Sequence, residues 1–399
     1  MKNNPKLNFT MLVFFIMFSI VLAMFAYFSG GVDFGVYYAA GRVYLQGGNP
    51  YEFSQLSKEI ISSTGKLNNP FYYAPWFIWT MLPFSVLPYS IARLLWALLN
   101  FILWFFSLFN LGKLMDYPQK GWPRWAMYLL VTFVFAWSTW GFEQVGILIF
   151  FMFTLTLLFA RHSQWNAVGI SLALLLFKPN VTALPVACIL LWLTLRNNWR
   201  PVIVAGSVLI IMVLLSVLIS PNWYLALFQP DKVTGLSHTL DSSGAVEITR
   251  YNTTLPDFLS AYNITGSAAN LIYAIVIIFG MVVAVLTLYY STSILQLAAL
   301  ILLVNFAVIP YALFYDYPAL VLTLFYANFL LLQKSSLTWI RTTANILVLL
   351  SLFIGSIISF RYWIVIILEL FMAASIFSRK ERPSPSNTQL NSPVRFPEQ

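Results

Sequence analysis

Charge is what this sequence has least of. Only 9% of its 399 residues are Asp, Glu, Lys or Arg, against about 25% in ordinary soluble domains. So few charges cannot cover a folded domain with a solvated surface, which excludes a soluble enzyme, a disordered chain and a nucleic-acid-binding protein. The single cysteine, Cys188, excludes an intrachain disulfide.

Long apolar runs take the place of charge. Hydrophobic residues make up 60% of the chain and aromatic residues 18%, and several uncharged stretches approach or exceed the ~18 residues of a transmembrane helix. Residues 9–29 form the first run, which lacks the short core and small-residue cleavage site of a signal peptide and therefore predicts an uncleaved span. The sequence predicts an all-α polytopic membrane protein.

Two polar stretches, 30–70 and 221–268, separate the apolar segments and are predicted to be external loops, the first with short helices at 34–47 and 52–63. The basic, Pro- and Ser-rich residues 378–399 predict a disordered cytoplasmic tail after a single transmembrane domain, 1–377. The remaining predicted apolar segments are 71–88, 90–111, 124–142, 146–160, 166–178, 181–195, 201–220, 269–290, 293–309, 318–333, 341–359 and 362–377.

The distribution of Lys and Arg predicts the orientation. Thirteen apolar segments would place the termini on opposite sides, yet the basic residues near both ends are typical of the cytoplasmic side. Residues 71–88 are short and broken by Pro75, Pro83 and Pro88, so we predict that they are re-entrant or interfacial. About twelve crossings of the inner (plasma) membrane follow, with 14 of the 22 cations inside, and most of the net charge of +9 is a topology signal.

The acidic residues fall mainly outside, and Asp33 is the first of them. It follows two glycines and opens a helical pattern that pairs it with Tyr37, and Tyr38 with Arg42, at i,i+4 spacing. As a helix N-cap, Asp33 would contribute about 1 kcal/mol, and the tyrosines would lie at the membrane interface. A functional role for Asp33 depends on what else meets it.

Further polar residues stand at other external junctions: Glu143 and Gln144 in WGFEQVG, Lys178 in LLLFKPNV, Asp316 in YALFYDYPAL, and Arg250 in the second external loop. Each alone is compatible with a structural role, such as a snorkelling lysine. Together they predict a rim of carboxylates and cations over an apolar body. Such a rim suits a lipid-linked phosphosugar, whose phosphate needs a cation and whose acceptor hydroxyl needs a carboxylate base.

Three stretches carry a resemblance to a known family: DFGVYYAAGRVYLQGGNPY, FYYAPWFIWTMLPFSVLPYSIARLLWALLN and FEQVGILIFFMFTLTLLFARHSQWNAVGISLALLLFKPNVTALPVACILLWLTLRNNWR. In this order they resemble glycosyltransferase family 87, a group of GT-C superfamily enzymes that includes polyprenyl-phosphate-mannose-dependent mannosyltransferases of bacterial envelopes. The resemblance covers about residues 30–200, with a weaker echo in PYALFYDYPALVLTL.

The resemblance implies inverting transfer of a hexose from a polyprenyl-phosphate-linked donor to an envelope glycan or glycolipid on the extracytoplasmic face, with Asp33 as general base. Mannose is the first candidate for the sugar, although Tyr315, Asp316 and Tyr317 stand where mannosyl members are expected to carry histidine. The candidates for binding the donor phosphate are Lys178, Arg250 and Arg42. The candidates for positioning the acceptor or a metal are Glu143, Gln144, Tyr37, Tyr38, Tyr315 and Asp316.

Two other functions stay open: a lipid-linked sugar flippase or transporter, and an envelope polysaccharide ligase or polymerase. A transporter places functional charge near the middle of the membrane, where Glu369 is the one acid well inside an apolar segment. No nucleotide-binding motif or metal-spaced cluster stands out, so we expect no obligatory cofactor, with a divalent metal left open. The expected partners are the lipid-linked sugar, its acceptor and the bilayer, without nucleic acid.

Overall fold

The computed structural model describes residues 5–28, 33–66, 70–115, 122–220, 253–334 and 362–377, and all regular structure in these residues is helical. The prediction of an all-α protein is therefore confirmed for the described part of the chain. Arg250, the predicted segment 341–359, most of the second external loop and the predicted tail 378–399 lie outside the described residues.

The N-terminal part contains two long helices with three short ones between them. They are α1 (Pro5–Phe28), α2 (Asp33–Leu45), α3 (Phe53–Thr64), α4 (Trp76–Ser85) and α5 (Tyr89–Leu114). Helices α2 and α3 agree with the two short helices predicted in the first external loop. Helix α4 has 10 residues and is about 15 Å long, half the ~30 Å of a bilayer core, so residues 71–88 do not cross the membrane as one helix.

The middle of the chain forms closely spaced helices with short connections. They are α6 (Trp122–Val131), the π-helix η1 (Thr132–Ala136), α7 (Trp137–Phe142), α8 (Gly146–Arg161), α9 (Trp165–Leu175), α10 (Pro179–Leu195) and α11 (Trp199–Ser216). Helices α6, η1 and α7 follow one another without a break and make one membrane-length helix. Pro179 is the first residue of α10. Proline has no backbone N–H, but an N–H at this position would have no partner within the helix, so Pro179 favours a helix start directly after Lys178.

The described C-terminal part begins at residue 253, inside the predicted external loop 221–268. Its elements are α16 (Leu255–Ala261), α17 (Gly266–Tyr290), α18 (Ile294–Val308), the 3-10 helix η2 (Phe314–Ala319), α19 (Leu320–Lys334) and α21 (Trp363–Phe377). The predicted apolar segment 318–333 is thus divided between η2 and α19, because Pro318 lies in a tighter 3-10 turn before the α-helix begins.

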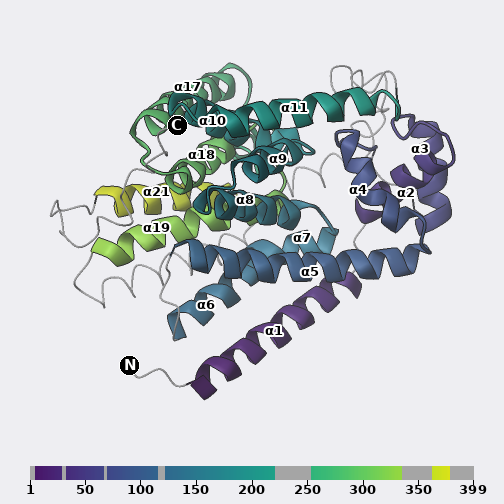
Figure 1. Cartoon of the computed structure of the whole chain (residues 1–399), viewed down its shortest axis with the longest axis horizontal. Helices are drawn as coiled ribbons and strands as arrows, with labels where there is room; N and C mark the ends of the chain where they lie inside the picture. The colour runs from purple at the N-terminus through teal and green to yellow at the C-terminus, as the bar shows by residue number, and fades with distance from the viewer. Residues whose placement is uncertain are drawn as a thin grey trace.

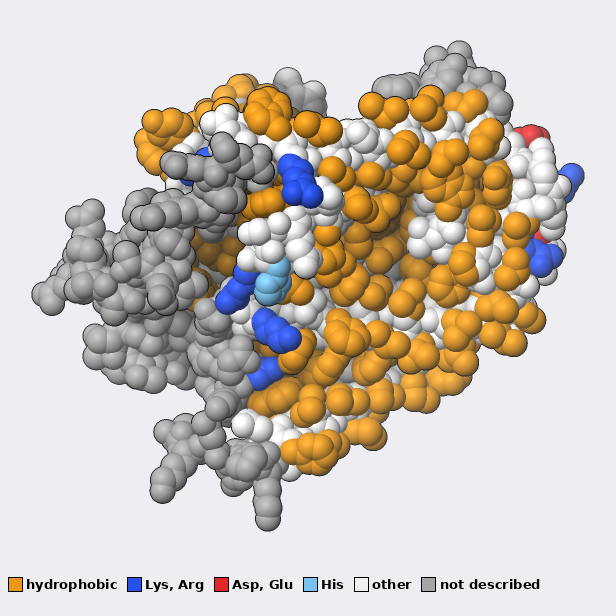
Figure 2. Space-filling view, in the orientation of Figure 1, with side chains coloured by type: hydrophobic (Ala, Val, Ile, Leu, Met, Phe, Trp, Pro, Cys, Tyr) orange, Lys and Arg blue, Asp and Glu red, His pale blue; other side chains and the backbone are white. Residues whose placement is uncertain are grey.

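Membrane residence is supported by the length and surface of the helices. Five described helices are long and apolar enough to cross a bilayer: Asn8–Phe28, Tyr89–Leu114, Arg124–Phe142, Trp199–Ser216 and Gly266–Tyr290. Figure 2 shows a broad band of exposed hydrophobic side chains, with a group of Lys and Arg side chains to one side and a few charged side chains at the other end. An apolar belt of this kind is stable in contact with lipid. The number of about twelve crossings stays a prediction.

The short helices gather beyond one end of the long ones. Figure 1 shows α2, α3 and α4 together at the right of the view, where α5 begins. Helices α2 and α4 touch at Gly41, where a Cβ would overlap the Ser85 side chain, and Ser85 Oγ donates a hydrogen bond to the Tyr38 carbonyl oxygen at 3.0 Å. This close contact sets the position of α2, and with it the position of Asp33.

Candidate active site

Most of the predicted site residues come from helix ends that meet beside the N-terminus of α2. The chain reaches this place five times, through α2, the residues before α4, the α7–α8 connection, the α9–α10 connection and η2. The side chains contributed are Asp33, Tyr37, Tyr73, Glu143, Gln144, Lys178, Tyr315 and Asp316.

A chain of hydrogen bonds ends on the carboxylate of Asp33. Tyr73 Oη donates to Gln144 Oε1 at 2.7 Å, and Gln144 Nε2 donates to Asp33 Oδ2 at 2.6 Å. Tyr37 Oη lies 2.7 Å from Tyr73 Oη and is the donor of that pair, because the single hydroxyl proton of Tyr73 is already given to Gln144. The donors therefore all point toward Asp33, which fixes the orientation of its carboxylate.

Burial controls the basicity of Asp33. Removal from water raises the pKa of its partly buried carboxyl to about 6, although the hydrogen bond from Gln144 and the positive charge of Lys178 both lower it, while Asp316 raises it. A carboxylate with this pKa is mostly ionised at neutral pH and is a stronger base than an ordinary aspartate. Asp33 is thus suited to accept a proton.

Lys178 and Asp316 form a buried ion pair next to this chain. Lys178 Nζ lies 2.5 Å from Asp316 Oδ1, and the other carboxylate oxygen accepts the Leu313 backbone N–H at 3.1 Å. Burial by itself would lower the pKa of Lys178, but the attraction of Asp316 outweighs it and the pKa lies above its ordinary value. The ammonium also lies 5.4 Å from the centre of the Tyr73 ring and 5.0 Å from that of Tyr315, so a fixed positive charge lies close to the Asp33 network.

Glu143 belongs to a second ion pair that the sequence did not reveal. Arg93 Nε, near the start of α5, lies 2.5 Å from Glu143 Oε1, and Arg93 Nη2 donates to the Tyr27 carbonyl oxygen at 2.8 Å. Glu143 ends α7 with a positive φ of 56°. Its other oxygen, Oε2, is buried without a hydrogen-bond partner among the described residues, and burial raises its pKa to about 7 against the lowering effect of Arg93. Through its ion pair with Arg93, Glu143 therefore connects α5 and the end of α1 to the candidate active site.

Two predicted site residues are not brought to Asp33. Arg42, at the far end of α2, pairs with Glu59 at 3.2 Å. The Tyr38 hydroxyl donates to the Leu87 carbonyl oxygen at 2.8 Å, away from the hydrogen-bond chain. Both side chains hold α2 against its neighbours.

Tyr73 is a member of the hydrogen-bond chain that was not predicted from the sequence. Its signal was the position of a tyrosine pair directly before a proline-broken apolar segment, in FYYAPWF. Only the fold shows that Tyr73 is buried and turned toward Gln144. Among the residues described, no group of three or more His, Cys, Asp and Glu side chains could hold a metal ion, and the expectation of no obligatory cofactor stays a prediction.

Gly146 allows η2 to lie against the start of α8. A Cβ at this position would overlap the Tyr315 carbonyl oxygen, which also accepts a hydrogen bond from Thr139 Oγ1 at 2.9 Å. We expect Gly146→Ala to push aside the backbone that carries Asp316 and to lower the free energy of unfolding by about 1–3 kcal/mol, as overpacking does. Thermal unfolding in detergent measures this.

The matched control is Gly206→Ala, because a Cβ at Gly206 meets nothing within 4 Å. Alanine there should leave stability unchanged or raise it by up to about 1 kcal/mol through helix propensity. Equal unfolding temperatures for the two variants would show that the packing of η2 against α8 does not require glycine at position 146.

The chain is an integral membrane protein, because it has apolar helices of membrane length. Its cluster of ionisable side chains lies where helix ends meet. The chain belongs to glycosyltransferase family 87, whose family model matches residues 71–314. It is therefore a membrane glycosyltransferase, and the predicted family is confirmed. Gln144 and Lys178 lie inside the matched range, whereas Asp33 precedes it and Asp316 follows it. No curated protein matches the chain, and neither does any solved structure.

Proposed function

We propose that this chain transfers a hexose from a polyprenyl-phosphate-linked donor to a hydroxyl of an envelope glycan or glycolipid on the extracytoplasmic face, with inversion at the anomeric carbon. The observation that carries the proposal is the position of Asp33, a partly buried carboxylate with a raised pKa, oriented by Gln144 and placed close to the charge of Lys178. Membership of family 87 supports the reaction class.

Asp33 is the general base in this scheme. Its Oδ2 accepts the hydrogen bond from Gln144, so Oδ1 is the oxygen that takes the proton of the acceptor hydroxyl. The acceptor oxygen then forms the new bond to the anomeric carbon. The bond from that carbon to the phosphate oxygen breaks on the opposite face, and its electron pair leaves with the polyprenyl phosphate. Attack from the face opposite the leaving group inverts the anomeric configuration.

Lys178 is the cation for the departing phosphate. Its pair with Asp316 keeps it protonated and in place, and a fixed positive charge stabilises the negative charge that develops on the leaving group. Arg250 is a second candidate from its position in the sequence, whereas the pairing of Arg42 with Glu59 gives that residue a structural role.

The remaining residues position the reactants. Tyr37, Tyr73 and Gln144 orient the base through their hydrogen bonds, and Glu143 holds the neighbouring helix end through Arg93. Tyr315 lies against Lys178 and is the candidate for contact with the sugar. Mannose remains the first candidate for that sugar, with the Tyr315–Tyr317 motif as the place where a different hexose would be selected.

The rate of transfer should depend on pH through Asp33. Because its pKa is raised to about 6, the rate should fall as the pH drops through that value and the base becomes protonated, and should level off above it. Gln144→Leu removes a hydrogen bond that lowers the pKa, so the midpoint should move to higher pH. The control is Gln46→Leu, which loses only an exposed contact to Glu59 and should leave the midpoint of the pH–rate profile in place. The same shift of the midpoint in both variants would exclude Asp33 as the titrating base.

Mass spectrometry of lipid extracts tests the proposal as a whole. A strain that lacks this protein should accumulate the glycan or glycolipid acceptor without its added hexose, and the wild-type chain should restore the product. Accumulation of a completed lipid-linked oligosaccharide would indicate a ligase or polymerase instead. Unchanged lipids would overturn the proposal.

A further inference from the structure

A cavity lies far from Asp33, between α1, α5 and α6. Its volume is about 270 Å³, and its walls are four phenylalanines, two leucines, Trp125 and Tyr128, with Asn8 and Arg124 as polar members. The cavity meets α5 at Phe105–Phe109, whereas Arg93 of the candidate active site is near the start of the same helix. Sixteen residues of helix separate Arg93 from Phe109, roughly 24 Å, so this is a distinct place in the protein.

Polar side chains mark the level of this cavity in the membrane. Asn8 and Arg124 begin two of the candidate membrane spans, within the first turn of their helices, and Lys113 stands next to the end of a third span. Lys113 Nζ lies 4.4 Å from the centre of the Phe109 ring. Three helix ends with polar or basic residues thus surround an apolar cavity, which is the arrangement expected at the boundary between lipid headgroups and acyl chains.

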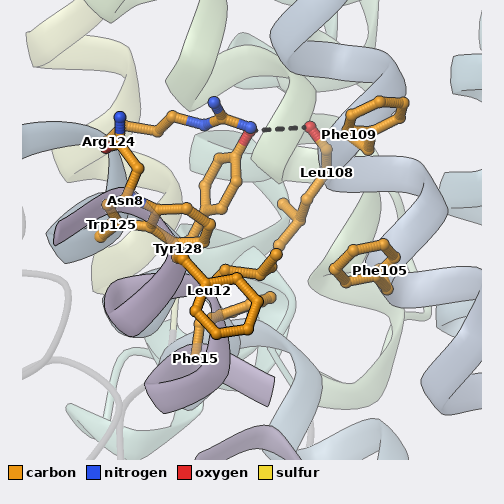
Figure 3. Close-up of a pocket in the computed structure, with 10 residues that line it drawn as sticks. Asn8, Leu12, Phe15, Phe105, Leu108, Phe109, Arg124, Trp125 and Tyr128 are labelled. Atoms are coloured by element: carbon orange, nitrogen blue, oxygen red, sulfur yellow. Dashed lines mark hydrogen bonds between the residues drawn. The ribbon is translucent and has the colours of Figure 1, made fainter. Parts of the chain in front are cut away.

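The cavity has a polar end and an apolar end. Arg124 lies across its polar end, with the guanidinium carbon 5.2 Å from the ring centres of both Trp125 and Tyr128. At the same end the Tyr128 hydroxyl donates to the Leu108 carbonyl oxygen at 3.2 Å, and Figure 3 shows Leu12 and Phe15 farther from it. A ligand that fits must carry an anionic group at one end and a hydrocarbon chain at the other.

We propose that this cavity binds one anionic glycerophospholipid, with the phosphate at Arg124 and Asn8 and part of an acyl chain among the phenylalanines. Guanidinium groups bind phosphate through charge-assisted hydrogen bonds, and basic pockets between transmembrane helices suit anionic headgroups. Arg124 in the cavity wall and Lys113 against the Phe109 ring are both cations, so this end of the cavity disfavours a headgroup that adds a positive charge.

The proposed function places this lipid in the cytoplasmic leaflet, because the candidate active site lies at the other end of α5. The assignment of the leaflet and the exclusion of the donor as occupant rest on that function, whereas the cavity and its basic rim are independent of the reaction. The polyprenyl-phosphate donor is a poor occupant, because its phosphate is needed at Lys178 and not at Arg124.

Native mass spectrometry of the full-length chain in detergent tests the proposal, with phosphatidylglycerol and phosphatidylcholine of the same acyl chains as the probes. Wild type should retain phosphatidylglycerol in preference to phosphatidylcholine. Arg124→Gln should weaken phosphatidylglycerol binding about tenfold, the loss of one charge-assisted hydrogen bond. Leu12→Phe, which fills the cavity, should weaken the binding of this lipid without removing a charge.

Arg200→Gln is the matched control. Arg200 is an exposed cation of α11 that bonds Asn166 and is not part of the cavity wall, so its removal should leave lipid retention unchanged. Equal retention of both lipids by wild type, or equal loss in Arg124→Gln and Arg200→Gln, would overturn the proposal. If Arg124→Gln does not fold, Leu12→Phe decides: full retention by that variant excludes the cavity as the site. These readouts do not use sugar transfer, so they stand or fall separately from the proposed function.

Discussion

Asp33→Asn should fold normally and transfer sugar about 10²- to 10⁴-fold more slowly than wild type, the range that general base catalysis contributes. Asparagine can still accept the hydrogen bond from Gln144 Nε2, so the network and the helix start should persist while the basic oxygen is lost. The measurement is transfer from polyprenyl-phosphate hexoses in membranes, with the protein level checked in the same samples.

The control for Asp33→Asn is Glu52→Gln, which changes an exposed carboxylate at the start of α3. It should keep wild-type activity, and retained activity in Asp33→Asn would remove Asp33 as the base. A flippase or transporter predicts the reverse pattern, with Asp33→Asn active and Glu369→Gln inactive. Glu369 lies in α21 and forms no ion pair with any residue that the structure describes, so its substitution should leave a glycosyltransferase active.

Lys178→Met should lose both stability and activity. It leaves the fully buried carboxylate of Asp316 without its cation, and breaking a buried ion pair in this way lowers the free energy of unfolding by about 3–5 kcal/mol. The unfolding temperature and the rate of sugar transfer should both be lower than in wild type. Lys58→Met, which removes an exposed lysine from α3, should change neither.

The double variant Lys178→Met with Asp316→Asn separates the two roles of Lys178. Replacing both partners removes the uncompensated charge, so most of the stability should return, and the amide oxygen of the new asparagine side chain can still accept the Leu313 N–H. Activity should stay at least about 10²-fold below wild type, because no cation faces the departing phosphate. Recovery of activity together with stability would show that Lys178 has only a structural role.

Most helices of the membrane domain could be predicted from the sequence. The segments 146–160, 181–195 and 293–309 correspond to α8, α10 and α18 within a few residues, because an apolar run and the Pro or polar residue that ends it are local features. The division of residues 318–333 into η2 and α19 was not predicted. It depends on the contact of η2 with Gly146 and Thr139, far away in the chain.

The sequence predicted which residues form the candidate site better than it predicted which of them contact one another. Asp33, Gln144 and Lys178 were selected because they are polar residues at helix ends, and the fold brings them together. Sequence alone did not pair Lys178 with Asp316 or Glu143 with Arg93, and it passed over Tyr73. Arg42 was selected as a cation for the phosphate, but it lies at the other end of α2 from Asp33 and pairs with Glu59 of α3.

By itself the sequence determined that this is a helical membrane protein of glycosyltransferase family 87, because apolar length, scarcity of charge and family motifs are readable along the chain. Tertiary structure alone decided which helix ends meet. The partners of the Asp33 chain and of the Lys178 pair lie 36 to 138 residues apart. Their contacts follow from how the helices pack, and the same packing removes the water that would otherwise keep the pKa of Asp33 near its ordinary value.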